Sequence, residues 1–253
     1  MVYFIGAGPG AADLITVRGK NLLEQADVII YAGSLVNPEL LRYAGPGCSI
    51  HNSALLTLEE VVALIEEAEK QGQTTVRLHT GDPCLFGAVR EQMDCLEKLG
   101  IEYEICPGVS SFCGAAAALQ MEYTLPEISQ SVVITRMAGR TAVPERESIA
   151  SFAAHKATMV IFLSAGMLPE LSRELIAGGY SPDTPAAIVY KATWPEEKKL
   201  ICTVEELADR ARQQQITKTA LIIVGDAVNQ CGYKRSKLYD PCFTTEFRQG
   251  ADT

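Results

Sequence analysis

The stretch VYFIGAGPG, residues 2–10, decides the fold of the first part of this chain. Its apolar run leads into a turn with three glycines, and the segment TVRGKNLLEQA (16–26) that follows has helical spacing of its apolar residues. A second apolar run, DVIIYA (27–32), comes next. A buried strand, a glycine turn, a helix and a second strand in this order predict a βαβ unit.

The same alternation of strands and helices continues through the first half. Residues 32–52 are rich in Gly, Pro and Asn and are expected to be irregular. The next segment, 57–72, repeats apolar residues at helical spacing, and Thr57 with Glu60 forms a capping-box pattern at its start. Further along we expect a strand at 74–80, a helix at 87–100, a strand at 103–108 and a small-residue helix at 110–119.

The rhythm changes around residues 120–130, where LPEISQ (125–130) is typical of a connector. We therefore expect two α/β domains with a cleft between them, an N-terminal domain 1–120 and a C-terminal domain 121–253. In the second domain the pattern predicts strands at 131–137, 158–164, 186–192, 198–204 and 219–228, with helices from about 148, at 167–179 and at 205–214. The tail 233–253 is expected to be extended or frayed, with Tyr239 and Phe243 held against the body.

Composition excludes several functional classes. A chain of 253 residues with 47% apolar and 21% charged residues is typical of a globular protein, and no apolar run is long enough to cross a bilayer. Residues 1–30 lack the layout of a secretory signal, so we expect a cytoplasmic protein. The net charge of −9 argues against general nucleic-acid binding. Eight cysteines contain no C-x-x-C pair and only three histidines accompany them, which predicts reduced thiols and no metal site.

The glycine turn allows two interpretations. Gly6, Gly8 and Ala11 satisfy the G-x-G-x-x-G/A pattern of a Rossmann-type NAD(P)-dependent oxidoreductase. That pattern needs an acidic residue at the end of the second strand to hold a ribose, yet this strand ends in Tyr31-Ala32-Gly33. Pro9 also removes one backbone N–H from the turn. The turn therefore favours close approach of a bulky group over phosphate binding, with a simple tight turn as the alternative.

Three further turns follow predicted strands, where α/β proteins place ligands. They are Thr80-Gly81-Asp82-Pro83, Pro107-Gly108-Val109-Ser110-Ser111 and Ala192-Thr193. Asp82 has a plainer alternative as a helix cap, and so have Ser110 and Ser111. A serine nucleophile is not favoured, because no G-x-S-x-G elbow surrounds these serines.

The combination of GAGPG, DLITVRG (13–19), TGDP and PGVSS in this order resembles the tetrapyrrole (corrin/porphyrin) methylase family, over nearly the whole chain. The resemblance implies two α/β domains with S-adenosyl-L-methionine in the trough between them, S-adenosylhomocysteine as a product, and a homodimer. Carried over by motif, it implies cofactor contacts from nine residues: Pro9, Thr80, Gly81, Asp82, Leu85, Ser110, Ser111, Leu163 and Ala192.

Within the family, the chain is similar to the branch that methylates carbon 11 of precorrin-4 or cobalt-precorrin-4, in cobalamin biosynthesis. YAGSLVNPELL (31–41) and ITRMAGRTAVPERESI (134–149) carry this likeness. The uroporphyrinogen-methylating branch has an Asp after the Tyr of its second strand and a later Gly-Lys pair, and this chain departs at both places. No general base is therefore assigned, and the presence of cobalt in the substrate stays open.

A corrin precursor carries several carboxylates, which an acidic protein must hold with local cations. Arg136, Arg140 and Arg146 are the candidates, with solvated surface charges as the alternative. Tyr31, Ser34 and Asn52 are further substrate candidates, because they stand where the other branch differs. The histidines are expected to be structural. A non-enzymatic tetrapyrrole carrier is the competing hypothesis outside the enzymes.

Overall fold

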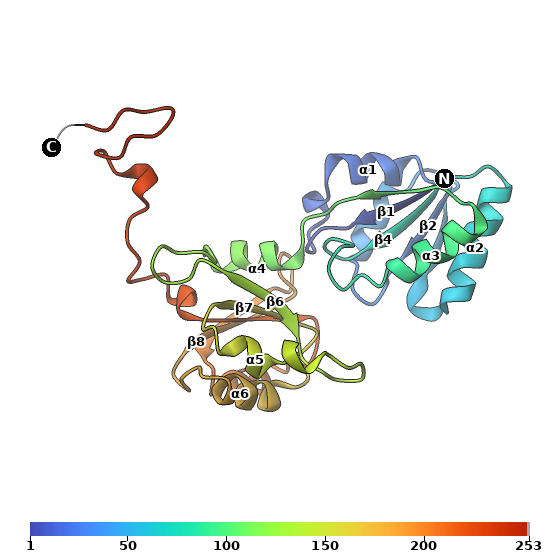
Figure 1. Cartoon of the computed structure of the whole chain (residues 1–253). Coiled ribbons are helices and arrows are strands. Elements are labelled where there is room, and N and C mark those ends of the chain that lie inside the picture. The colour runs from blue at the N-terminus through green and yellow to red at the C-terminus, as the bar shows by residue number, and fades with distance from the viewer. Residues whose placement is uncertain (252–253) are drawn as a thin grey trace. The chain divides into compact units, whose positions relative to one another are not determined.

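The computed structural model describes residues 1–251 and divides the chain into two compact units (Figure 1). The first unit comprises Met1–Ala115 with Lys191–Glu197, and the second comprises Ala116–Tyr190 with Lys198–Thr253. The predicted boundary after residue 120 lies five residues beyond this division, and the pattern did not predict that 191–197 joins the first unit. Both units contain a sheet with helices, so the predicted α/β class is confirmed. No helix within residues 1–251 is long and apolar enough to span a membrane.

The first unit is built on a five-stranded parallel sheet in the order β3-β2-β4-β1-β5 (Figure 1). Its strands are β1 (Val2–Gly6), β2 (Val28–Tyr31), β3 (Ser49–Asn52), β4 (Thr75–His79) and β5 (Tyr103–Cys106). The helices that connect them are α1 (Val17–Glu24), α2 (Leu58–Lys70) and α3 (Arg90–Leu99), and α4 (Ser111–Leu119) follows β5.

The central strands β1, β2 and β4 are buried on both faces, which explains the near-continuous apolar runs of β1 and β2. Successive residues of β1 belong to different hydrophobic clusters on the two faces of the sheet, with Ile5 in one cluster and Phe4 in the other. In the same way Ile29 and Ile30 of β2 face opposite sides, and all four side chains are fully buried. The sequence therefore specifies this sheet by burial on two sides rather than by alternation of apolar and polar residues.

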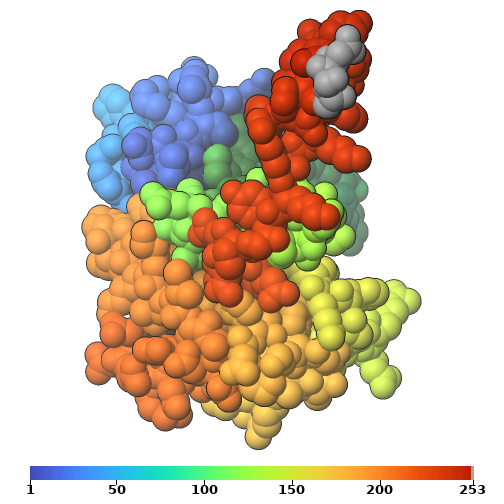
Figure 2. Space-filling model, turned by 90° about the vertical axis from the view of Figure 1, so that its left-hand side faces the viewer, coloured from blue at the N-terminus to red at the C-terminus, as the bar shows by residue number. Residues whose placement is uncertain are grey.

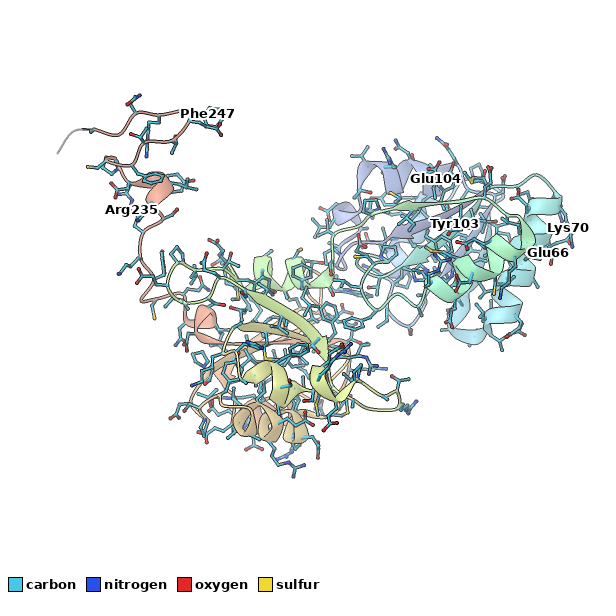
Figure 3. All side chains as sticks on the ribbon, viewed as in Figure 1. Glu66, Lys70, Tyr103, Glu104, Arg235 and Phe247 are labelled. Atoms are coloured by element: carbon cyan, nitrogen blue, oxygen red, sulfur yellow. The ribbon has the colours of Figure 1, made fainter. Side chains whose placement is uncertain are left out.

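The helix predicted at 57–72 forms as α2. The Thr57 hydroxyl accepts a hydrogen bond from the Glu60 backbone, and the Glu60 carboxylate accepts one from the Thr57 N–H, so the capping box is confirmed. On its outer side Lys70 pairs with Glu66 at 2.9 Å, one turn earlier (Figure 3). Such an exposed pair contributes only a few tenths of a kcal/mol, roughly 0.3–0.5, so the buried face holds the helix in place.

The expectation of irregular structure over 32–52 was wrong at its end. Residues 49–52 form β3, and Pro38–Tyr43 is a 3₁₀ helix. β3 is an edge strand that pairs with β2 alone, and Ser49 and Ile50 are exposed. An exposed edge strand needs no apolar run, so its sequence carries no strand pattern to detect.

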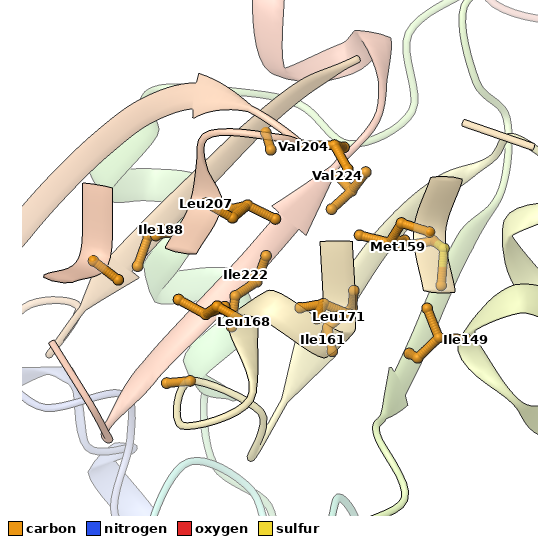
Figure 4. Packing of buried hydrophobic residues seen from close by; sticks show 14 of the residues in the cluster. Ile149, Met159, Ile161, Leu168, Leu171, Ile188, Val204, Leu207, Ile222 and Val224 are labelled. Carbon is orange, nitrogen blue, oxygen red and sulfur yellow. The ribbon is translucent and has the colours of Figure 1, made fainter. Parts of the chain in front are cut away.

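The second unit has a five-stranded mixed sheet in the order β6-β7-β10-β8-β9. β6 and β7 are parallel, and the remaining neighbours are antiparallel. The strands are β6 (Val132–Arg136), β7 (Thr158–Phe162), β8 (Pro185–Tyr190), β9 (Lys198–Thr203) and β10 (Ala220–Val224), and the helices that follow α4 are α5 (Ile149–Ala153), α6 (Leu168–Ala177) and α7 (Leu207–Gln213). Figure 4 shows the core between this sheet and its helices, with Ile222 of β10 near the side chains of Leu168 and Leu171 of α6.

The tail after residue 230 adds nothing to this core. A 3₁₀ turn, Lys237–Tyr239, is its single regular element within the described residues. Tyr239 is 70% exposed and Phe243 40% exposed, so the prediction that they are held down was wrong. The Phe247 side chain in this tail is 90% exposed (Figures 2 and 3). Within the tail, the Arg248 guanidinium donates hydrogen bonds to the carbonyls of Leu238 and Asp240. Residues 252–253 lie outside the described part of the chain.

Shortening one core side chain should show how strongly the second sheet depends on burial. Ile222 is fully buried, so Ile222→Ala should lower the free energy of unfolding by roughly 2–5 kcal/mol. Ile201 on the edge strand β9 is 62% exposed, and Ile201→Ala should change the free energy of unfolding by less than about 0.5 kcal/mol. Urea unfolding of both variants measures the difference, and equal losses would contradict this account of the core.

Candidate active site

The first unit places three of the predicted ligand turns at one edge of its sheet. β1 and β4 are neighbours, but the chain leaves β1 toward β2 on one side and leaves β4 toward β5 on the other. Such a reversal opens a crevice at the carboxyl ends of the strands, where α/β proteins bind ligands. The turns 7–10, 80–83 and 107–111 follow β1, β4 and β5 and therefore meet at this edge.

Backbone contacts between glycines hold these turns together. Gly8 N–H donates to the Gly81 carbonyl at 3.2 Å, and Gly81 N–H donates to the Gly8 carbonyl at 2.9 Å. A Cβ on Gly108 would lie 2.3 Å from the Gly81 oxygen and 2.6 Å from the Cα of Gly6. Real Cβ atoms do not approach so closely, so this packing requires glycine at Gly108. Gly8 and Gly81 also have positive φ angles of 80° and 60°, which glycine adopts without strain.

Asp82 links the second turn to the third. One carboxylate oxygen accepts from the Cys84 N–H at 2.8 Å, and the other accepts from the Gly108 N–H at 2.8 Å. Partial burial by itself raises the pKa of Asp82, but the bonds from Cys84 and Gly108 outweigh it and lower the pKa below its ordinary value. α3 begins only at Arg90, so Asp82 is not the cap of that helix. Its carboxylate instead stabilises two turns at once.

The segment 191–197 packs against the first glycine turn. Ala11 N–H donates to the Thr193 hydroxyl at 2.9 Å, and a Cβ on Gly10 would lie 2.1 Å from the Trp194 ring. On the other side Asn37 donates through its amide to the Gly10 carbonyl at 2.9 Å. Ala192, a predicted cofactor residue, is buried at this contact. Sequence analysis missed Trp194, although a single tryptophan next to a predicted ligand turn was a usable signal.

The other predicted cofactor residues are distributed over both units. Pro9 lies against Gly114 of α4, where a Cβ would approach it to 2.6 Å. Ser110 is buried, and its carbonyl accepts from Cys113 and Gly114, so it stands at the start of α4. Leu163 belongs to the second unit, where it follows β7 with a left-handed φ of 53° and is 61% exposed.

The predicted substrate residues of the first unit lie at the carboxyl ends of β2 and β3. The Ser53 hydroxyl donates to the Tyr31 carbonyl at 3.1 Å, and a Cβ on Gly33 would lie 2.2 Å from the Asn52 amide oxygen. Ser34 is exposed beside them. Tyr31, Ser34 and Asn52 therefore come from one corner of the sheet.

The predicted arginines lie in the second unit and make separate contacts. The Arg136 guanidinium donates to the carbonyls of Met137, Thr141 and Ala142, so it holds the loop that follows β6. The Arg146 side chain is 86% exposed and pairs with neighbouring Glu147 at 3.5 Å. Arg140 is exposed in the middle of the same loop. Their role toward carboxylates stays a prediction.

A pocket of about 230 Å³ opens beside the second turn, entirely within the first unit. Thr80 and Leu85 of the predicted cofactor set line it, and so do Ala32 and Ser53, the neighbours of Tyr31 and Asn52. Arg77 and His79 of β4 also line it, and both are buried. Arg77 was not predicted, although an arginine inside an apolar strand is a recognisable signal for a polar site.

Burial controls the charge of these two β4 side chains. It lowers the pKa of Arg77 to about 10, so the guanidinium stays protonated at neutral pH. Burial, with a smaller effect from the Arg77 charge, lowers the pKa of His79 to about 3, so its ring stays neutral. The pocket therefore has one fixed positive charge and one neutral imidazole.

Comparison with known proteins identifies the family. A sequence profile described as "Tetrapyrrole (Corrin/Porphyrin) Methylases" matches residues 1–208. The chain is 50% identical over 248 residues to the cobalt-precorrin-4 C(11)-methyltransferase of Methanocaldococcus jannaschii, covering 98% of this chain and 96% of that protein. It is 46% identical over 252 residues to the enzyme of the same name from Priestia megaterium, covering 98% of each.

Solved structures agree with this assignment. The X-ray structure of a cobalamin biosynthetic cobalt precorrin-4 methyltransferase is similar with a TM-score of 0.88 and 46% identity, over 90% of this chain and 95% of that one. The uroporphyrin-III C-methyltransferase of Thermus thermophilus, solved with S-adenosyl homocysteine, has a TM-score of 0.76 and 27% identity, over 92% and 95%.

The chain belongs to the tetrapyrrole methylase family. It is an S-adenosylmethionine-dependent methyltransferase, as the resemblance of its ordered motifs implied. The oxidoreductase alternative is not favoured.

Removing the Asp82 carboxylate should disconnect two turns of the site. We expect Asp82→Ala to weaken S-adenosylhomocysteine binding roughly 10-fold or more, because a charge-assisted hydrogen bond contributes about 1.5–3 kcal/mol. Calorimetric titration measures the affinity, and thermal unfolding shows whether the protein stays folded. Asp240→Ala is a matched control, because Asp240 accepts from Cys242 in the same local geometry in the tail. A lower melting temperature with unchanged affinity would show that Asp82 only stabilises the fold.

The buried His79 should make the protein sensitive to acid. An unfolded histidine takes up a proton as the pH falls below about 6.5, whereas His79 in the folded chain does so only near 3. Between these values the unfolded state binds more protons, so stability decreases with decreasing pH by at most about 1.4 kcal/mol per unit from this group. His79→Gln should have a shallower dependence in urea unfolding from pH 7 to 4. His155→Gln, which removes an exposed histidine, is the control, and identical slopes for the two variants would contradict this role of burial.

Proposed function

We propose that this protein transfers a methyl group from S-adenosylmethionine to carbon 11 of precorrin-4 or cobalt-precorrin-4, giving precorrin-5 or cobalt-precorrin-5 in cobalamin biosynthesis. The observation that carries this proposal is 46–50% identity over nearly the full length of two enzymes named for this reaction. The likeness to a cobalt precorrin-4 methyltransferase structure also supports it.

We propose that the cofactor is held by the turns of the first unit, through Pro9, Thr80, Gly81, Asp82, Leu85, Ser110, Ser111 and Ala192, together with Leu163 of the second unit. Two observations favour a fit. The glycines leave no side chains between the three turns, so a ligand can approach their backbones closely. Leu163 exposes a large apolar side chain in a left-handed conformation, which suits contact with an adenine ring.

Bound S-adenosylmethionine supplies an electrophilic methyl group on a sulfonium. The chain's own residues then act chiefly by positioning, because in-line transfer to an electron-rich pyrrole carbon needs no covalent enzyme intermediate. The glycine turns allow close approach and, being packed backbone to backbone, hold their geometry. The Asp82 carboxylate keeps two of these turns in register.

We propose that Tyr31, Ser34 and Asn52 contact the tetrapyrrole from the corner of the first sheet. Arg140 and Arg146 are exposed and present guanidinium groups to the carboxylates of the substrate. Arg136 takes part by shaping the loop that carries Arg140, since its donors already bond three carbonyls of that loop.

We further propose that the protein acts in the cytoplasm as a homodimer, as the family resemblance implies. Light scattering of the purified chain measures its mass in solution. A monomer of about 27.4 kDa at micromolar concentration would reject the dimer.

Methyl transfer with a labelled cofactor tests the reaction itself. We expect label from S-adenosylmethionine to appear in precorrin-4 or cobalt-precorrin-4, with NMR of the product placing the new methyl on carbon 11. Running metal-free and cobalt-loaded substrate in parallel shows which form is preferred. Substrate binding without transfer would favour a carrier, and tight NAD(P)H binding without S-adenosylhomocysteine binding would favour an oxidoreductase.

A further inference from the structure

The pocket beside β4 contains polar groups that the proposed reaction does not use. Arg77 is 6% exposed and His79 is 4% exposed, and both line the pocket. Charged or polar side chains this deeply buried normally have partners that compensate their lost hydration. The contacts of these two residues therefore indicate what the pocket is suited to hold.

Arg77 has only part of the partners that a buried guanidinium needs. Nε donates to the Gln92 amide oxygen at 2.9 Å, and Nη1 donates to the Ile30 carbonyl at 3.1 Å. Gln92 is in turn held by the Ala88 carbonyl at 2.9 Å. Within residues 1–251 no carboxylate pairs with Arg77, and Nη2 has no hydrogen-bond partner. The positive charge is thus fixed in orientation but not neutralised.

His79 has an unpartnered nitrogen in the same pocket. Its Nε2 is buried and has no hydrogen-bond partner among the described residues. The ring lies beside Phe4, with centroids 6.2 Å apart, which limits its freedom to turn. A buried polar atom without a partner is destabilising by about 1–3 kcal/mol, so such an atom in a native site calls for a function.

The remaining lining favours an anionic group over other ligands. Ser53 and Thr57 add hydroxyl groups, and Leu56 and Val61 add apolar surface. Glu91 is the acidic residue of this lining, and it is exposed to solvent, where its charge is screened. A carboxylate on a short alkyl arm matches a fixed cation, a ring N–H and apolar walls at once.

We propose that this pocket receives one carboxylate side chain of the tetrapyrrole, with Arg77 Nη2 and the Nε2–H of His79 as donors. The inference rests on the proposed function and assigns the pocket as a substrate subsite. The carboxylate of the tetrapyrrole neutralises the Arg77 charge and selects the His79 tautomer that carries its proton on Nε2. Because Nε2 is buried, the carboxylate reaches it only when the lining of the pocket relaxes.

Substitution of His79 tests the subsite in the full chain. His79→Leu removes the donor, and we expect the Kd and KM for cobalt-precorrin-4 to rise roughly 10- to 100-fold. His79→Gln places an amide N–H near Nε2 and should stay within about threefold of wild type. Affinity for S-adenosylhomocysteine should change little in either variant, which also shows that the protein is folded. His155→Leu, at an exposed position, is the matched control.

NMR of the wild-type protein tests the same contact without a mutation. The chain has three histidines, so ¹⁵N-histidine labelling gives few signals to assign. We expect the Nε2–H signal of His79 to shift with cobalt-precorrin-4 and with sodium propionate, but not with a substrate analogue whose carboxylates are amides. If wild-type protein methylates the tetrapyrrole while His79→Leu keeps its KM, or the signal does not move, the subsite is wrong and the proposed function stands. If wild type transfers no methyl group but propionate shifts His79, the proposed function is wrong and a carboxylate pocket stands.

Discussion

The site depends on the contact of three backbones at Gly6, Gly81 and Gly108. These glycines end or follow β1, β4 and β5, and no Cβ fits between them. Because the contact is backbone to backbone, it brings hydrogen-bonding groups of three turns to one edge with little freedom to move. Side chains at these positions would separate the strands' carboxyl ends, and the crevice would lose its shape before any ligand contact was lost.

The charges of Asp82 and Arg77 act on the same part of the sheet. Asp82 places its negative charge on backbone N–H groups of its own turn and of the next, so an otherwise flexible loop pair is fixed by charge-assisted bonds. Arg77 on β4, the strand that leads into this turn, is the opposite case, a buried cation without a carboxylate partner among residues 1–251. The Asp82 charge is compensated by hydrogen bonds within the fold, whereas the Arg77 charge has no carboxylate partner, although acidic residues outnumber basic ones in the chain.

Sequence patterns were sufficient where the signal is local. Apolar runs and glycine turns follow from burial and backbone freedom, so β1, β4 and the turns after them could be placed from their own residues. β3 could not, because an exposed edge strand has no apolar requirement. The return of 191–197 to the first unit could not be predicted either, since it depends on Trp194 and Thr193 meeting residues about 180 positions away. The Arg77–Gln92 pair is only 15 residues apart in the sequence, but it joins a strand to a helix, so no local pattern indicates it.

Residues other than glycine that have a left-handed φ fall into two groups, those that end a helix and those that do not. Gln120 and Gln215 follow α4 and α7, where a left-handed residue ends a helix. Leu163 and Lys191 instead follow strands, and Phe86 lies in the loop between β4 and α3, so helix termination does not explain them. Each costs roughly 1–2 kcal/mol relative to right-handed backbone. Of the cases that helix ends do not explain, Leu163, Lys191 and Phe86 lie in or next to predicted ligand positions and the pocket wall, which fits a role in aiming backbone and side chains at a ligand. Glu127 and Thr219 are left-handed as well and lie away from these positions, so a left-handed residue marks a site only together with its neighbours.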